Sequence, residues 1–173
     1  MHNDGVVADE QDPTALDAVT KALEEEGDIA ADYLEELLDI ADLDGDIDIS
    51  VRQGRASLEI VSEDPSALAL LVGRNGEVLD ALQDLTRLAV HERTGERSRL
   101  MLDIGGHRAA YRVELTALGN SAAAKVKETG KEFALSPMNA FERKVVHDAV
   151  AAAGLVSDSR GVDPNRYVVV LPA

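Results

Sequence analysis

The chain has 173 residues, no cysteine and a formal net charge of −16. Its length allows two small domains with separate cores, and the lack of cysteine excludes disulfide bonds and thiolate metal sites. No run of 18 apolar residues occurs, and the first residues, Met1-His2-Asn3-Asp4, are acidic where a signal peptide would be basic. We therefore expect a cytoplasmic protein that does not enter a membrane.

The negative charge is concentrated at the start of the chain. Residues 1 to 48 carry seventeen acidic side chains against the single base Lys21, whereas residues 49 to 173 carry sixteen of each sign. Because salt screens surface charge beyond about 10 Å, an acidic arm leaves the remainder able to bind nucleic acid. The four histidines never fall within one helical turn of each other, so we expect no metal and no cofactor.

Residues 1 to 27 are predicted to form an acidic, mostly disordered arm. Its first twelve residues hold little that could be buried, and a short helix through Leu16 and Leu23 would end at Gly27. From Asp28 onwards, apolar residues recur at helical spacing with acids on the opposite face. This pattern predicts an amphipathic helix at the start of the first domain.

The period of the apolar residues then changes from helical to alternating. Residues 47–51 and 56–60 alternate between apolar and polar on either side of Gln53-Gly54, which predicts a β-hairpin. Asp64 followed by Pro65 is a typical helix start, and we expect that helix to run to Val72.

A glycine-containing loop follows directly. Gly73 and Gly76 are three residues apart, with Arg74 and Asn75 between them, and the apolar pattern resumes afterwards. Glycine permits positive φ and close approach to the main chain, and the following helix directs its first N–H groups at an anion. The loop thus predicts a phosphate site with Arg74 as the charged contact. The loop alone fits an ordinary turn between two helices equally well.

The order of the predicted helices and strands favours a phosphate site over an ordinary turn. Helix, strand, strand, helix, glycine loop, helix and strand follow one another over residues 29 to 105, and this order resembles the type II KH domain. A KH loop of the form Gly-x-x-Gly clamps about four single-stranded nucleotides. The resemblance implies a KH domain at residues 28–105 whose RNA-binding residues are Gly73, Arg74, Asn75 and Gly76.

The remaining chain predicts a second, smaller domain at residues 106–173. A long helix ends at Gly130, and Gly119 inside it allows a bend or break because an interior glycine costs about 1 kcal/mol relative to alanine. A short strand follows at Phe133. Asn139 with Glu142 three residues later forms a capping-box pattern for another helix. Residues 155–160 and 166–171 are predicted to form a closing hairpin.

Arg143 and His147 lie four residues apart on that capped helix, so both project from one face. Arginine pairs with phosphate through two donors, and histidine hydrogen-bonds a sugar or phosphate oxygen. The same spacing recurs at Arg87 and His91, however. The spacing alone is therefore equally consistent with residues that stabilise the helix.

The residues around Arg143 and His147 are more informative than their spacing. The run Met138 to Val150, with the hairpin that bears Arg160 and Arg166, resembles the R-three-H domain, a single-stranded nucleic-acid-binding module. A KH domain followed by an R-three-H domain resembles the bacterial Jag family, also called SpoIIIJ-associated or KhpB proteins. The resemblance implies an α+β, cytoplasmic RNA-binding protein linked to cell elongation and division. It places RNA contacts at Arg143, His147 and Arg166, and implies a small stand-alone KH protein, or a second copy, as partner.

Three functions remain open at this point. We favour a non-enzymatic protein that binds single-stranded RNA, or single-stranded DNA, and acts as a post-transcriptional regulator or RNA chaperone. Aromatic residues are only 3% of the chain, so backbone clamping rather than base stacking is expected. A nuclease with His147 as general acid-base lacks a second base or a carboxylate cluster for metal ions. The third interpretation is a protein-interaction module in which the KH fold dimerises.

Overall fold

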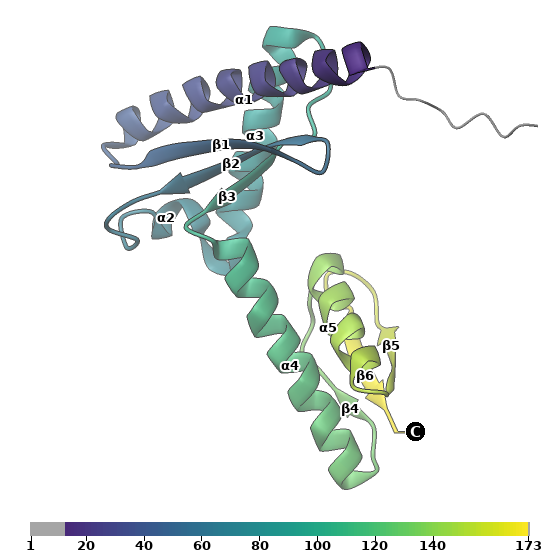
Figure 1. Ribbon diagram of the computed structural model, residues 1–173. Coiled ribbons are helices and arrows are strands. Elements are labelled where there is room, and N and C mark those ends of the chain that lie inside the picture. The colour runs from purple at the N-terminus through teal and green to yellow at the C-terminus, as the bar shows by residue number, and fades with distance from the viewer. Residues whose placement is uncertain (1–12, 173) are drawn as a thin grey trace, which may run out of the picture. The chain divides into compact units, whose positions relative to one another are not determined.

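A hairpin forms where apolar and polar residues alternate. In the computed structural model, which describes residues 13–172, β1 (Asp46–Arg52) pairs antiparallel with β2 (Arg55–Val61). Gln53 and Gly54 join them with φ of 51° and 67°, the positive values of a type I′ turn. β3 (Met101–Ile104) lies parallel to β2 on its other side, giving the order β1-β2-β3 (Figure 1).

Two helices cover one face of this sheet. α1 (Pro13–Ala41) and α3 (Glu77–Thr94) bury aliphatic side chains against the inward residues of β2 and β3. Each such side chain contributes roughly 1.5 to 3 kcal/mol by leaving water. The core is built from residues that include Leu34, Leu58, Ile60, Leu79, Leu100 and Leu102.

The structure differs from the sequence-based prediction at Gly27. α1 is one continuous helix from Pro13 to Ala41, so the prediction that Gly27 ends a short helix is wrong. Gly27 is buried, and a Cβ there would lie 2.6 Å from Cγ2 of Ile49. Glycine is therefore needed for the close approach of α1 to β1. Residues 13–27 of the expected disordered arm are helical, and residues 1–12 lie outside the described part of the chain.

The helix before the glycine loop is shorter than predicted. Only Ala69–Val72 form α2, whereas the sequence predicts a helix that begins at Pro65, directly after Asp64. Asp64 does cap the segment, since its carboxylate accepts hydrogen bonds from the N–H and hydroxyl of Ser66. The residues between are linked by bonds of the i to i+3 type, such as the N–H of Leu71 to the carbonyl of Leu68 at 3.0 Å. These tight turns replace the first part of the expected helix.

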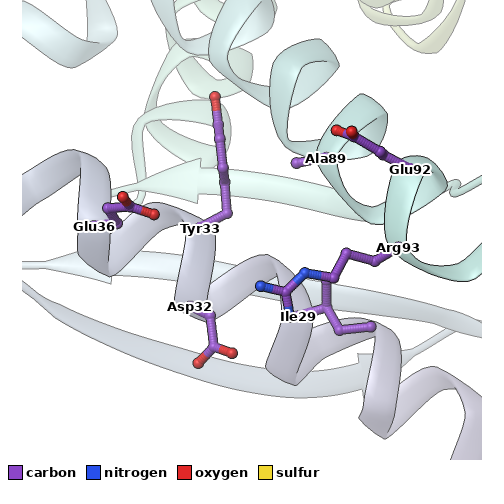
Figure 2. Close-up of a pocket in the computed structure, with 7 residues that line it drawn as sticks. All are labelled: Ile29, Asp32, Tyr33, Glu36, Ala89, Glu92 and Arg93. Atoms are coloured by element: carbon purple, nitrogen blue, oxygen red, sulfur yellow. The ribbon is translucent and has the colours of Figure 1, made fainter.

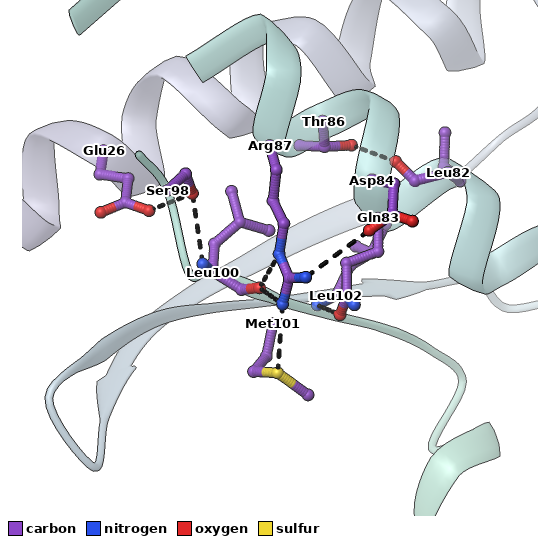
Figure 3. A network of polar contacts seen from close by, with 10 residues as sticks. All are labelled: Glu26, Leu82, Gln83, Asp84, Thr86, Arg87, Ser98, Leu100, Met101 and Leu102. Atoms are coloured by element: carbon purple, nitrogen blue, oxygen red, sulfur yellow. Dashed lines mark hydrogen bonds and ion pairs between the residues drawn. The ribbon is translucent and has the colours of Figure 1, made fainter. Parts of the chain in front are cut away.

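Side chains of α3 hold the outer edge of β3. Arg87 donates from Nε and Nη2 to the carbonyl of Leu100 at 2.9 and 2.8 Å, and the Gln83 side chain accepts from the N–H of Leu102 at 3.0 Å (Figure 3). Backbone groups at a sheet edge need such partners when they are buried. Arg87 is thus a structural residue.

The second part of the chain has its own core. The chain divides into two compact units, Met1–His107 and Arg108–Ala173. α4 (His107–Thr129) is followed by β4 (Phe133–Ala134), α5 (Ala140–Ala152), β5 (Val156–Arg160) and β6 (Tyr167–Leu171), and the strands pair antiparallel in the order β4-β6-β5. Their shared core is formed by Ala122, Ala123, Val126, Val146, Val150, Leu155, Val168 and Val170.

The glycine inside α4 does not break the helix. α4 runs continuously through Gly119 as one long helix, and the break that an interior glycine allows does not occur. A Cβ at this position would lie 2.8 Å from the Cβ of Ala149 and 3.1 Å from the carbonyl oxygen of Val146. Gly119 therefore allows α4 and α5 to cross closely, and this packing offsets the roughly 1 kcal/mol that glycine costs inside a helix.

Candidate nucleic-acid interface

The glycine loop is a tight connection between α2 and α3. The N–H of Gly73 donates to the carbonyl of Ala69 at 3.1 Å, and Arg74–Gly76 form one 3₁₀ turn that leads directly into α3. Gly73, Asn75 and Gly76 have positive φ of 71°, 53° and 83°. Glycine adopts such values without strain, and asparagine tolerates the left-handed region better than most residues.

Both glycines are also required by packing. A Cβ on Gly73 would lie 2.9 Å from the Cβ of Val78, and a Cβ on Gly76 would lie 2.9 Å from Nε2 of His107. A Cβ on Gly73 would clash with Val78 and one on Gly76 with the His107 side chain, and the positive φ at both positions would strain any other residue. The need for glycine is thus explained within the fold and is not in itself a sign of a ligand.

The tip of the loop is where a ligand would have access. Arg74 and Asn75 are exposed, whereas Gly76 is buried. The first turn of α3 carries Glu77 and Asp80, whose negative charge competes with an incoming anion for the helix N-terminus. The loop therefore exposes a basic side chain at its tip, Arg74, whereas the first turn of α3 is acidic.

In the second unit, Arg143 lies inside the fold. Its side chain is 10% exposed, and Nη1 donates to the carbonyl of Met138 at 2.9 Å and to the carboxylate of Asp163 at 3.1 Å. The N–H of Met138 in turn donates to the carbonyl of Arg166 at 3.0 Å. Arg143 thus joins the segment before α5 to the turn between β5 and β6.

His147 is half-buried between α5 and β5. Its Nδ1 lies 2.6 Å from the Oγ of Ser157, and its Nε2 lies 2.8 Å from the Oγ of Ser159. A neutral imidazole has one donor and one acceptor nitrogen, and a hydroxyl can match either. The two serines therefore fix the ring orientation. They lie two residues apart on a predicted strand, so their shared face was readable from the sequence, although we did not predict them.

Arg166 is held at the end of the same turn. The residue is half-buried, and its Nε is enclosed without a hydrogen-bond partner among residues 13–172. Arg160, the other arginine of the predicted hairpin, forms an ion pair with Glu132 at 3.2 Å. Of the three residues predicted for this site, the structure places His147 and Arg166 in half-buried positions and Arg143 in a buried one.

The start of α5 confirms the predicted capping box. The Asn139 side chain accepts from the N–H of Glu142 at 2.9 Å, and the Glu142 carboxylate accepts from the N–H of Asn139 at 2.6 Å. The hydroxyl of Tyr111 on α4 donates to the same carboxylate, a contact that the sequence did not predict. Burial, followed by this hydrogen bond, raises the pKa of Tyr111 above its ordinary value. Glu142 therefore ties α5 to α4.

A separate hollow of about 470 Å³ lies between α1 and α3 (Figure 2). Its polar lining is mainly acidic, from Asp32, Glu36 and Glu92, with Arg93 as the basic residue. Such a lining is unfavourable for a phosphate backbone. Within residues 13–172, no cluster of three or more His, Cys, Asp or Glu side chains is suited to a metal ion, and no helix is long and apolar enough to cross a membrane.

The helices, sheet and capped α5 of the second unit define an R-three-H domain. The family model of this domain matches residues 113–172. A relative from Clostridium symbiosum, named RNA-binding protein KhpB, is 32% identical over 145 residues, which cover 83% of this chain and 64% of the relative. The chain belongs to the bacterial KhpB family, also called Jag.

Other relatives with the same name match a similar share of the chain. The relative from Lactiplantibacillus plantarum is 33% identical over 140 residues, which cover 80% of this chain and 42% of the relative. The relative from Bacillus subtilis is 30% identical over 129 residues, 73% of this chain and 62% of the relative. The chain therefore spans between 42% and 64% of the length of these three proteins. The KH-like α+β unit lies before the R-three-H domain.

Proposed function

We propose that this chain is a non-enzymatic protein that binds single-stranded RNA through both of its units. In the first unit, a type II KH domain, the contacts are Arg74 and Asn75 at the tip of the turn between Gly73 and Gly76. The observation that carries the proposal is the exposure of this polar tip between two glycines that packing holds in place. The family resemblance and the names of the relatives support it.

The second RNA surface is proposed around His147 and Arg166. The two serine hydroxyls orient the imidazole, and the Arg166 guanidinium lies at the end of the neighbouring turn. Arg143 belongs to this site through the turn that it holds, because its Nη1 is already bonded to Met138 and Asp163. In the cell, we propose a cytoplasmic role in post-transcriptional control of elongation and division.

The decisive test is a charge reversal at the loop tip. Arg74→Asp with Asn75→Asp should abolish most RNA binding in a titration while circular dichroism shows an unchanged fold, since exposed loop residues contribute little to stability. Arg93→Asp with Arg97→Gln makes the same change in net charge at exposed positions at and just beyond the end of α3 and should retain binding. Equal affinity of the folded loop variant and the parent chain would contradict the proposal.

A further inference from the structure

The two edges of the first sheet are treated differently by the fold. At β3, the carbonyl of Leu100 and the N–H of Leu102 are bonded by side chains of α3. At β1, no further strand pairs in the described part of the chain, and β2 occupies one side only. Alternate residues of an antiparallel strand direct their N–H and C=O groups away from the paired neighbour. β1 therefore presents an open edge (Figure 1).

Apolar side chains accompany this open edge. Ile49 and Val51 face the same side as the core residues of β2, yet they are 41% and 37% exposed. A hollow of about 370 Å³ lies beside them, bordered by Thr20, Glu24 and Asp28 of α1. An added strand would place its own apolar side chains in this hollow and cover both residues.

We propose that the occupant is β1 of a second copy of this chain, paired antiparallel to form a continuous six-stranded sheet. The sequence of β1 is complementary to itself in the register that pairs all seven of its residues. Around a two-fold axis at Ile49, Ile47 faces Val51 of the second copy and Asp46 faces its Arg52. Apolar residues then meet on the helix side, and two ion pairs form on the open side.

The surrounding charge limits the strength of this contact. Glu24 and Asp28 border the hollow, so each copy brings acidic side chains toward the other. A seven-residue strand also offers less area than the roughly 800 Å² per partner of a standard interface. Self-association is therefore expected to be weak. It is best measured near 0.3 M salt, where the Debye length is about 5 to 6 Å.

Charge reversal with rescue tests the register. The full chain, Asp46→Arg, Arg52→Asp and the double variant are compared by sedimentation over a concentration series. Each single reversal puts like charges opposite each other twice and should raise the dissociation constant by roughly tenfold or more, whereas the double variant should return it to within about threefold. Within the hairpin, residue 52 also lies opposite Arg55, so Arg52→Asp replaces a pair of like charges with a pair of opposite charges. A loss of association in this variant therefore does not result from a weaker hairpin.

Glu59→Lys is the matched control, because it reverses a charge on the same face of the sheet but on the central strand β2. It should leave the dissociation constant unchanged, and circular dichroism should show all variants folded. A chain that is monomeric throughout the series would overturn the proposal and leave the edge to a strand of another protein. Self-association that the single reversals do not weaken, or that the double variant does not restore, would overturn it as well.

Discussion

Replacing Arg143 is expected to affect stability before affinity. Its side chain is 10% exposed and donates to the Met138 carbonyl, so Arg143→Ala leaves that carbonyl without its charged donor. A hydrogen bond of this kind is worth roughly 1.5 to 3 kcal/mol. The ion pair with Asp163 adds about 1 kcal/mol at most, because the Asp163 side chain is 68% exposed.

We therefore expect Arg143→Ala to lower the free energy of unfolding of the C-terminal unit by roughly 2 to 3 kcal/mol. In a domain of this size that corresponds to a fall in melting temperature of about 10 to 20 °C. Asp163→Ala should cost less than about 1 kcal/mol. Calorimetry on the full chain measures both changes in stability. Near-ultraviolet circular dichroism follows the same unfolding through the tyrosines, of which Tyr111 and Tyr167 lie in the C-terminal unit and Tyr33 in the first unit.

A direct phosphate contact predicts a different pattern. Arg143→Lys keeps the charge but loses the planar set of donors. If Arg143 contacts phosphate directly, this variant should retain much of its RNA affinity. If Arg143 positions the turn, the variant should lower the stability of the C-terminal unit. RNA titration well below the melting temperature separates the two effects. An unchanged melting temperature for Arg143→Ala together with weakened RNA binding would refute the positioning role.

Three further variants probe other contacts. His147→Ala should weaken RNA binding by roughly 1 to 2 kcal/mol in a titration. If the imidazole only stabilises the fold, the RNA affinity should change little. Arg87→Ala should lower the free energy of unfolding by roughly 1 to 3 kcal/mol in a urea titration without changing RNA affinity, because it frees the Leu100 carbonyl. Gly119→Ala should cost roughly 1 to 3 kcal/mol by overpacking against Ala149, seen as a lower melting temperature.

Elements with strong local signals were predictable from the sequence. The alternating residues around Gln53-Gly54 form the expected hairpin, and Asn139 with Glu142 forms the expected capping box. In both cases, the residues that determine the structure are neighbours in the sequence. The exposed loop tip at Arg74 is of the same kind, because the flanking glycines mark a turn by themselves.

Long-range packing explains what was not predicted. Gly27 was interpreted as a helix end and Gly119 as a position that allows a bend or break, but each lies where a distant element leaves no space for a Cβ. The spacing of Arg143 and His147 gave their common helix face correctly. It could not give their partners, because Asp163 and Ser157 lie on the closing hairpin, whose register the spacing does not contain.

The helical state of residues 13–27 changes how the acidic arm should be tested. The hydroxyl of Ser98 donates to the carboxylate of Glu26 (Figure 3). The next residue, Gly27, packs on Ile49. Val19 and Leu23 line a hollow that Val90 also borders. A deletion up to Gly27 would remove half of α1 and destabilise the first unit. A change in RNA binding by such a deletion would then have two causes that cannot be separated, the loss of acidic charge and the loss of packing by α1.

Neutralising charge without shortening α1 avoids this problem. We expect replacement of exposed acids in the first half of α1 by their amides to tighten RNA binding at low salt, because these carboxylates repel phosphates, and the gain should fade near 0.3 M salt, where the Debye length is about 5 to 6 Å. The test set is Asp17, Glu24 and Glu25, and the matched control set on the second half of the same helix is Glu35, Glu36 and Asp39. Equal gains from both sets would show that overall charge, rather than the arm, controls affinity. Unchanged affinity at low salt in the test set would remove the inhibitory role altogether.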